Sequence, residues 1–175
     1  NIKHPNVIQC IDMFENECQI FFVYEYIQSG DLKKYARDLK LNPQFYTINT
    51  ILKLSMQMIE GTKVLHKYGI IHRDIKTTNM MITVNSPKKK SVVSYSNGFS
   101  EVQVTYTNLA DVIVKIIDFG LSRILGKFEK SNDPYGSLCF KAPELIEHVP
   151  YDFKVDVWAI GVTIFYLVYR ELHFE

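Results

Sequence analysis

Hydrophobic positions follow a helical period between Tyr46 and Tyr68. The apolar residues recur at intervals of three, four and seven: Ile48, Ile51, Leu52, Met58, Ile59 and Leu65. This spacing predicts a long helix with one buried face, ended by Gly69. A shorter helix is expected from Leu32 to about Leu39, with Asp31 as its N-cap.

Two runs near the start have the β-branched and aromatic content of strands. They are Ile8 to Phe14 and Gln19 to Tyr24, and a polar stretch from Glu15 to Glu17 separates them. The arrangement predicts a β-hairpin. A third run, Val112 to Ile117, predicts a strand that leads directly into Asp118-Phe119-Gly120.

Two further helices are predicted in the last third of the chain. Ala142-Pro143-Glu144 begins a short one, because proline is tolerated in a first turn and glutamate complements the helix dipole there. Phe153 to Tyr169 is apolar almost all the way round, which is typical of a helix at the centre of a domain. Its uncharged stretch, Val157 to Tyr169, is shorter than the roughly 18 residues that span a bilayer, so no membrane segment is expected. Leu121 to Lys141 is expected to be a loop.

Residues 84–111 differ in composition from the segments around them. They contain Lys88-Lys89-Lys90, closely spaced serines and threonines, and the turn-forming dipeptide Asn97-Gly98. We expect a surface excursion with solvated lysines and an extra strand from Glu101 to Tyr106.

Composition and charge exclude several classes of protein. With 47% hydrophobic and 22% charged residues, the 175-residue chain is too apolar to be intrinsically disordered. Its net charge of +1 gives no electrostatic reason to expect a nucleic-acid or anionic-membrane partner. Its three cysteines have the spacing of neither a disulfide framework nor a structural zinc site, so we expect a reducing, intracellular location, by default the cytoplasm.

Candidate chemistry lies on two tight loops beside predicted strands. Asp74 lies in the stretch from His72 to Asn79, which reads His-Arg-Asp-Ile-Lys-Thr-Thr-Asn, and Asp118 follows the strand at Val112 to Ile117. Carboxylate and amide oxygens are ligands that Mg²⁺ prefers, and a lysine counters phosphate charge. Each short motif is weak alone, whereas their order and spacing are specific.

This ordered set resembles the catalytic domain of eukaryotic protein kinases. The motifs are His72-Arg73-Asp74 with Lys76 and Asn79, then Asp118-Phe119-Gly120, Ala142-Pro143-Glu144, and Asp156-Val157-Trp158 with Gly161. The resemblance implies an α+β, protein-kinase-like two-lobed fold, present in part. Residues 1–25 would end the small β lobe, 26–31 would form the hinge, and 32–175 would belong to the mainly α-helical large lobe through its central buried helix. Residues 84–111 would be an inserted loop.

The resemblance also implies catalytic roles. Asp74 would accept the proton of the substrate hydroxyl, and Lys76 would stabilise charge on the transferred phosphoryl group. A lysine at this spacing looks like the serine/threonine branch. Asn79 and Asp118 would hold Mg²⁺ against the phosphates of ATP.

The nucleotide site is expected at the hinge, again by resemblance. The backbones of Glu25 and Ile27 would hydrogen-bond adenine, with Tyr24 as the gatekeeper. Asp31 would reach the ribose, and Met81 would lie under the base. Taken in isolation, the same stretch is equally well explained by a strand, a turn and a helix cap.

Three residues near the motifs receive structural roles from the resemblance. His72 would pack in a hydrophobic column with Phe119, as a histidine between isoleucines and an arginine more often packs than reacts. Asp156 would cap the backbone of the catalytic loop. Ser137 would line the pocket against that loop.

A regulatory hypothesis concerns the activation segment, residues 118–144. Asp133 occupies the position where a phosphate usually sits, so its carboxylate could pair with Arg73 without modification. This pattern is similar to that of calcium- and calmodulin-regulated kinases, and a regulatory domain could lie outside the chain. Ser131 is a competing phosphorylation candidate, although an exposed, solvated serine is the simpler interpretation.

Two function classes follow from the resemblance. One is an ATP-dependent protein serine/threonine kinase that uses Mg²⁺ and phosphorylates protein substrates. The alternative is a pseudokinase or docking module that keeps the fold without catalysis. The chain contains no Gly-x-Gly-x-x-Gly loop. Because that loop and the small-lobe lysine are expected before Asn1, the chain reads as a fragment that is inactive alone.

Overall fold

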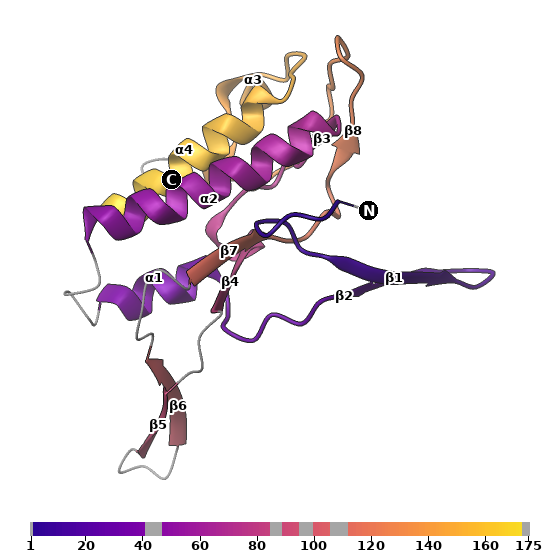
Figure 1. The fold of residues 1–175 in the computed structure, drawn as a ribbon. Coiled ribbons are helices and arrows are strands. Elements are labelled where there is room, and N and C mark those ends of the chain that lie inside the picture. The colour runs from indigo at the N-terminus through magenta and orange to yellow at the C-terminus, as the bar shows by residue number, and fades with distance from the viewer. Residues whose placement is uncertain (1, 41–46, 85–88, 95–99, 106–111, 173–175) are drawn as a thin grey trace.

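A computed structural model describes residues 2–40, 47–84, 89–94, 100–105 and 112–172 (Figure 1). Its elements in chain order are β1 (Cys10–Glu15), β2 (Ile20–Tyr24), α1 (Leu32–Lys40), α2 (Ile48–Lys67), β3 (Ile70–Ile71), β4 (Met80–Val84), β5 (Lys89–Ser94), β6 (Ser100–Thr105), β7 (Val112–Ile116), β8 (Arg123–Ile124), α3 (Pro143–Ile146) and α4 (Lys154–Tyr169). Short 3₁₀ turns lie at Thr77–Asn79 and Leu138–Phe140. Helices and small antiparallel sheets together agree with the expected α+β class.

The helices α2 and α4 lie side by side and form the body of the molecule, with α1 packed at one end (Figure 1). The long helix predicted from the apolar period is confirmed over Ile48–Lys67, and Tyr46 lies outside the described residues. Its predicted buried face is only half right, because Ile48, Leu52 and Ile59 are exposed. Its N-cap is Thr47, whose hydroxyl accepts from the N–H of Thr50. Gly69 follows the helix with a φ of 71°, a conformation that glycine adopts readily. The shared core includes Leu54, Met58 and Leu65 of α2 with Ile160 and Leu167 of α4.

Strands β4 and β7 form an antiparallel pair that packs on α2. The edge of β7 is completed by side chains, because Gln57 of α2 donates to the carbonyl of Val112 and accepts from the N–H of Val114. Asn6 donates to the carbonyl of Val114. These bonds satisfy backbone groups that would otherwise be unpaired inside the molecule. The end of β7 that leads to Asp118 is held by the N-terminal segment, because the N–H of Ile116 donates to the carbonyl of Asn6.

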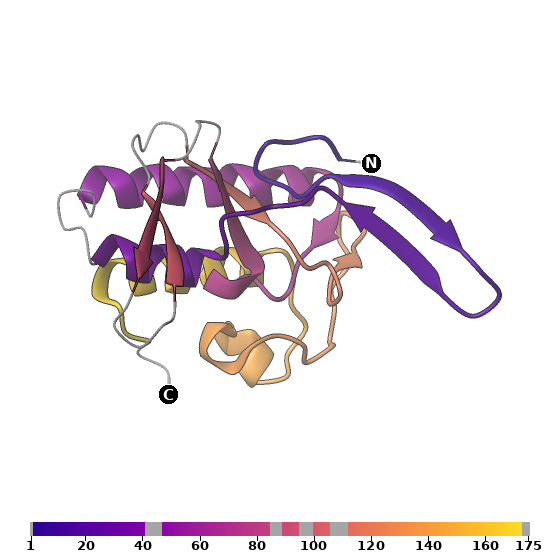
Figure 2. The same ribbon diagram turned by 90° about the horizontal axis from the view of Figure 1, so that it is seen from below.

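The predicted N-terminal hairpin is confirmed and projects away from the helices (Figures 1 and 2). Its first strand begins at Cys10 and not at Ile8, because the N–H of Ile8 donates to the carbonyl of Ile116 in β7. Many of the hairpin's apolar side chains are exposed: Ile11, Met13, Phe14, Ile20, Phe21, Phe22, Val23 and Tyr24.

The segment expected to be an insertion contains a second hairpin, β5–β6. The extra strand is confirmed at Ser100–Thr105, and its partner β5 was not predicted. Lys88, the Asn97-Gly98 turn and Tyr106 lie outside the described residues. Val84 and Val112 are paired at the end of the β4–β7 ladder, so the chain leaves and re-enters the domain at one point.

The C-terminal part contains the two expected helices, with Pro143 at the start of α3. The expected loop at 121–141 needs a correction, because it includes strand β8, paired with β3, and the 3₁₀ turn at Leu138–Phe140. Only one side of α4 is buried in the described part of the chain, since Val157, Trp158 and Tyr169 are exposed. No helix among the described residues is long and apolar enough to cross a membrane.

Candidate active site

The loop between β3 and β4 carries Asp74 and is held from behind by Asp156 of α4. This aspartate is 1% exposed, and its two oxygens accept the N–H groups of His72 and Arg73, each at 2.8 Å. It also bonds the Nε2 of His66 at 2.8 Å. Arg73 has a φ of 68°, an unfavourable value for a residue with a Cβ. The expected capping role of Asp156 is therefore confirmed, and its bonds hold the loop in that conformation.

His72 is fully buried and has partners for both ring nitrogens. Its Nε2 donates to the carbonyl of Ile117 at 3.0 Å, and its Nδ1 accepts the N–H of Asp74 at 3.3 Å. Its ring lies 5.3 Å from that of Phe119, centroid to centroid. These contacts confirm the expected packing of His72 on Phe119, and they leave no position from which its ring could transfer a proton.

Asp74 is the centre of a hydrogen-bond network. Its Oδ2 accepts from the Nζ of Lys76 and the Nδ2 of Asn79, both at 2.8 Å, and its Oδ1 accepts from the hydroxyl of Ser137 at 2.8 Å. Burial alone would raise the pKa of the Asp74 carboxyl, but these bonds and the positive charge of Lys76 outweigh burial and lower that pKa. Asp74 is therefore ionised at neutral pH.

Ser137 connects Asp74 to Lys76. Its hydroxyl donates to Asp74 and accepts from the Nζ of Lys76 at 2.8 Å, as expected for a residue that lines the pocket against the catalytic loop. One hydroxyl group can thus contact the carboxylate and the ammonium at the same time. A hydroxyl brought by a substrate would need the same pair of contacts.

Asn79 and Asp118 supply the oxygens expected to hold a cation. The Nδ2 of Asn79 donates to both the carbonyl and the Oδ2 of Asp74, so the direction of the amide is fixed and its oxygen is the end left to act as a ligand. The N–H of Ile117 donates to the carbonyl of Asn79 at 3.0 Å. Asp118 directly follows Ile117, so this bond holds the backbones of the two candidate ligands near each other. Asp118 is exposed, with a φ of 63°. A carboxylate and an amide oxygen form a donor set that suits Mg²⁺.

The residues expected at the nucleotide site gather around the start of β4. Met81 pairs with Lys115 in the β4–β7 ladder and with Asp31 through a β-bridge. Glu25 joins them through an ion pair of 2.8 Å between its carboxylate and the Nζ of Lys115. Asp31 also accepts the N–H of Lys34, which confirms its role as the cap of α1. The Ile27 side chain is buried.

Tyr24 is the last residue of β2 and directly precedes Glu25. Burial raises the pKa of its phenol, and electrostatic interactions with Cys10 and Asp118 raise it further. Tyr24 itself is 41% exposed.

The activation segment is held against the loop by the ion pair proposed from the sequence. Arg73 donates to the Oδ2 of Asp133 at 2.7 Å, and the Arg73 side chain is only 6% exposed. The hydrogen bonds from Arg73, Ser131 and Arg123 lower the pKa of Asp133. The pairing of Asp133 with Arg73 is confirmed.

Ser131 differs from its expected exposure. It is 1% exposed, and its hydroxyl donates to Asp133 at 3.0 Å. Its backbone pairs with Tyr151 through bonds in both directions. The expectation of a solvated serine was wrong because a strand-like bridge to a distant segment buries it.

Three residues of this site were not identified from the sequence. Arg123 donates to Asp133 at 3.1 Å, and the hydroxyl of Tyr151 donates to the carbonyl of Asp133 at 2.7 Å. The guanidinium of Arg73 lies over the ring of Tyr135, with its Cζ 4.8 Å from the centroid of that ring. Arg123 and Tyr135 could have been suspected from their place in the activation segment, whereas nothing in the local sequence marks Tyr151.

Comparisons with known proteins agree with this geometry. A family model described as the protein kinase domain matches residues 1–175. The chain is 29% identical over 180 residues to a probable myosin light chain kinase of Dictyostelium discoideum, covering 99% of this chain and 39% of that protein. It is 32% identical over 177 residues to the serine/threonine-protein kinase ppk25 of Schizosaccharomyces pombe, covering 99% and 34%. It is 30% identical over 167 residues to the smooth-muscle myosin light chain kinase of Gallus gallus, covering 95% and 7%.

The chain therefore spans well under half the length of these relatives. The family match, in contrast, extends over its whole length and includes every motif assembled around Asp74. The chain belongs to the protein kinase domain family, of the serine/threonine type, and carries part of its two-lobed α+β fold.

Proposed function

We propose that the full-length protein containing this chain is an active, ATP-dependent protein serine/threonine kinase. The observation that carries this proposal is the Ser137 hydroxyl, which bonds the carboxylate of Asp74 and the ammonium of Lys76 together. An ionised carboxylate and a cation around one hydroxyl are the groups that phosphoryl transfer to a hydroxyl requires.

Asp74 would orient the substrate hydroxyl and accept its proton as the hydroxyl oxygen bonds to the γ-phosphorus of ATP and ADP departs. Its low pKa keeps it ionised, and the bond from Asn79 keeps its Oδ2 in place. The ammonium of Lys76 would stabilise the negative charge on the phosphoryl group during its transfer. Each side chain is positioned by the others, so little reorganisation is needed during the reaction.

Asn79 and Asp118 would hold Mg²⁺, because their oxygens suit this cation and the amide of Asn79 is already directed by Asp74. The bound ion would neutralise negative charge on the ATP phosphates. Glu25 and Ile27 would bind adenine through their backbones beside Tyr24, with Asp31 at the ribose and Met81 under the base. This division would make residues 1–25 the end of the small lobe, 26–31 the hinge and 32–175 the large lobe.

The alternative is a pseudokinase or docking module that binds partners without transferring phosphate. In such a module the four polar residues proposed for catalysis and metal binding would all be present without a catalytic role: Asp74, Lys76, Asn79 and Asp118. Phosphate transfer from ATP to a generic protein substrate separates the two hypotheses. For the active kinase, Asp74→Asn should lower kcat by about a hundredfold or more while ATP binding is kept.

The matched control is Asp152→Asn, an aspartate that bonds only the N–H of Lys154 before α4 among the described contacts. It should retain full activity. Equal activity of wild type and Asp74→Asn would contradict the role of Asp74. A wild-type protein that binds ATP but transfers no phosphate would support the docking module.

We infer further that residues 1–175 alone transfer no phosphate, because no Gly-x-Gly-x-x-Gly loop lies within them to cover the ATP phosphates. Measurable transfer by this segment would contradict that inference. The three cysteines form no disulfide, which supports a reducing, cytoplasmic site of action.

A further inference from the structure

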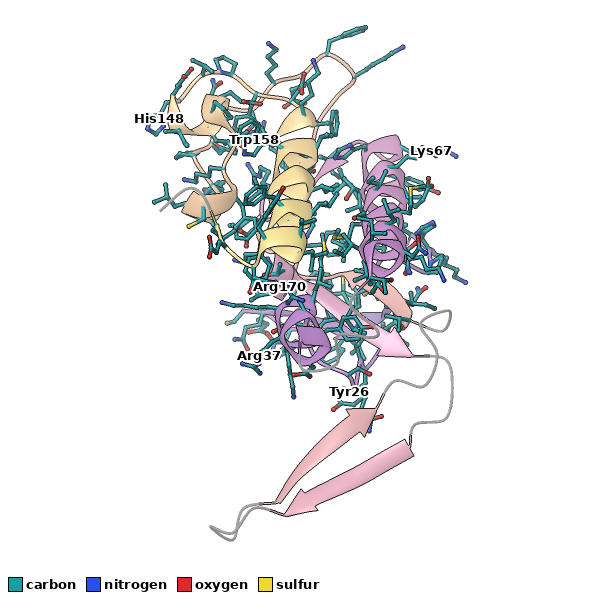
Figure 3. The ribbon with its side chains drawn as sticks, turned by 90° about the vertical axis from the view of Figure 1, so that its left-hand side faces the viewer. Tyr26, Arg37, Lys67, His148, Trp158 and Arg170 are labelled. Carbon is teal, nitrogen blue, oxygen red and sulfur yellow. The ribbon has the colours of Figure 1, made fainter. Side chains whose placement is uncertain are left out.

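A groove of about 390 Å³ lies between α1 and the end of α4. Its six lining residues are Asp31, Lys33, Lys34, Arg37, Tyr166 and Arg170. Figure 3 shows Arg37 and Arg170 on the same side of the molecule, far from Lys67 at the other end of α2. The groove is separate from the catalytic loop, and the catalytic roles proposed for the chain use only one of its residues, Asp31.

The groove is strongly basic in a chain whose net charge is only +1. Four of its residues are cations and one is an anion. The anion, Asp31, is engaged as the cap of α1, where it accepts the N–H of Lys34 at 2.7 Å. Lys33, Lys34 and Arg37 are exposed on one surface of α1, while Leu32, Tyr35 and Ala36 of the same helix are buried.

The shape of the groove is fixed by the helices that form it. Arg170 ends α4 with a φ of 66°, and its guanidinium donates to the carbonyl of Ala36 in α1. This bond joins the two walls. The backbone of α1 that carries the three cations is therefore attached to the end of α4.

One end of the groove, at Asp31, is connected through β4 to the segment that carries Asn79. Asp31 is bridged to Met81 of β4, and Asn79, two residues before Met81, ends the 3₁₀ turn that leads into this strand. A peptide whose hydroxyl reaches Asp74 would have neighbouring side chains within reach of the groove. The occupant is thus expected to be part of the phosphorylated protein.

We propose that this groove binds acidic side chains of the protein substrate, through Lys33, Lys34 and Arg37. The proposal rests on the proposed kinase function and names its substrate class, polypeptides with aspartate or glutamate near the acceptor hydroxyl. Charge complementarity carries the choice, because three exposed cations in one groove attract carboxylates and repel basic peptides. Tyr166 adds an aromatic wall for the aliphatic parts of the peptide.

The test measures binding and phosphorylation by the full-length protein. Three fluorescein-labelled peptides have one serine flanked on both sides by three aspartates, three alanines or three lysines. Fluorescence anisotropy should give a Kd for the acidic peptide about tenfold below that of the neutral one, because each exposed charge pair contributes modestly. The preference should weaken as salt is raised, and the KM values should follow the same order.

The test variant is Lys33→Glu/Lys34→Glu/Arg37→Glu, which should reverse the preference toward the lysine peptide. The matched control is Lys53→Glu/Lys63→Glu/Lys67→Glu, an equal change of charge on exposed positions of α2. It should keep the acidic preference. Equal loss of preference in both variants would overturn the proposal, since overall charge and not the groove would then be responsible.

Measuring peptide binding and phosphorylation separately distinguishes the proposed kinase activity from the proposed role of the groove. A protein that binds the acidic peptide selectively but phosphorylates no peptide would contradict the kinase proposal and support the groove. A protein that phosphorylates acidic, neutral and basic peptides with equal KM values would support the kinase and overturn the groove.

Discussion

The guanidinium of Arg73 and the carboxylate of Asp133 meet at 2.7 Å, across 60 residues of sequence. Arg73 directly precedes Asp74, whereas Asp133 belongs to the activation segment. The pair therefore couples the order of that segment to the backbone beside the proposed base. In this protein a genetically encoded carboxylate supplies the negative charge, and no modification is needed to form the pair.

The first prediction concerns Asp133→Ala in the full-length protein. Removal of the carboxylate leaves the largely buried guanidinium of Arg73 without its ion pair. We expect kinase activity to fall and limited proteolysis within residues 121–141 to become faster. The control is Glu129→Ala, which removes an exposed partner of Arg123 and leaves the Arg73 pair intact. Unchanged activity of Asp133→Ala would refute the coupling.

The second prediction concerns Asp156→Ala. The substitution removes the acceptor of two buried backbone N–H groups and the partner of the partly exposed His66. The free energy of unfolding should decrease by about 3–5 kcal/mol, since two buried backbone N–H groups are left without an acceptor. Denaturation in urea measures the change. Asp152→Ala, which removes only a bond to the N–H of Lys154 at the start of α4, should cost about 1 kcal/mol.

The third prediction concerns pH and Asp74. Its pKa is lower in the folded protein than in the unfolded chain, so its ionised form stabilises the fold above the ordinary aspartate pKa near 4. This contribution should be lost only as the pH falls below that value, through the lower folded pKa. The difference in unfolding free energy between wild type and Asp74→Asn should thus be constant from pH 7 to pH 5 and shrink below pH 4. A decline already between pH 7 and pH 5 would contradict the lowered pKa.

The fourth prediction concerns Gly61, where α2 lies against the N-terminal segment. A Cβ at this position would stand 2.7 Å from the carbonyl oxygen of Asn6 and 2.9 Å from the Cδ1 of Ile116. Gly61→Ala should lower the unfolding free energy by about 1–3 kcal/mol, despite the better helix propensity of alanine.

Gly161 of α4 provides the matched comparison for Gly61. In the described part of the chain, a Cβ at Gly161 meets nothing within 4 Å. Gly161→Ala should therefore gain up to about 1 kcal/mol from helix propensity, measured by thermal unfolding of the same protein. Equal effects of the two substitutions would show that the contact with Asn6 is not what requires glycine.

Local sequence patterns predicted a helix or a strand correctly where the hydrophobic residues are typical of that element. The apolar stripe of α2 and the β-branched run of β7 each gave the correct element within two residues. The boundary of β1 was displaced because Ile8 pairs with Ile116, more than 100 residues away. No property of the short sequence around Ile8 indicates such a partner.

The candidate site residues were predicted from the order of the motifs, which identified the family. Asp74, Lys76 and Asn79 were named from one eight-residue stretch, and the structure brings them within hydrogen-bond distance. The burial of Ser131 could not be predicted, because it depends on its pairing with Tyr151, twenty residues later. The basic groove was also missed, since Arg37 and Arg170 come to line one groove only in the folded chain.

The pairing of Val84 with Val112 has a practical consequence for protein engineering. The Cα atoms of residues paired in this way are about 5 Å apart. A connecting segment therefore has to span only this short distance between the ends of β4 and β7. The intervening segment could be exchanged for a two-residue turn or for a fluorescent reporter with adjacent termini. Such a graft would leave Met81 and Lys115 in register and label the kinase away from its catalytic loop.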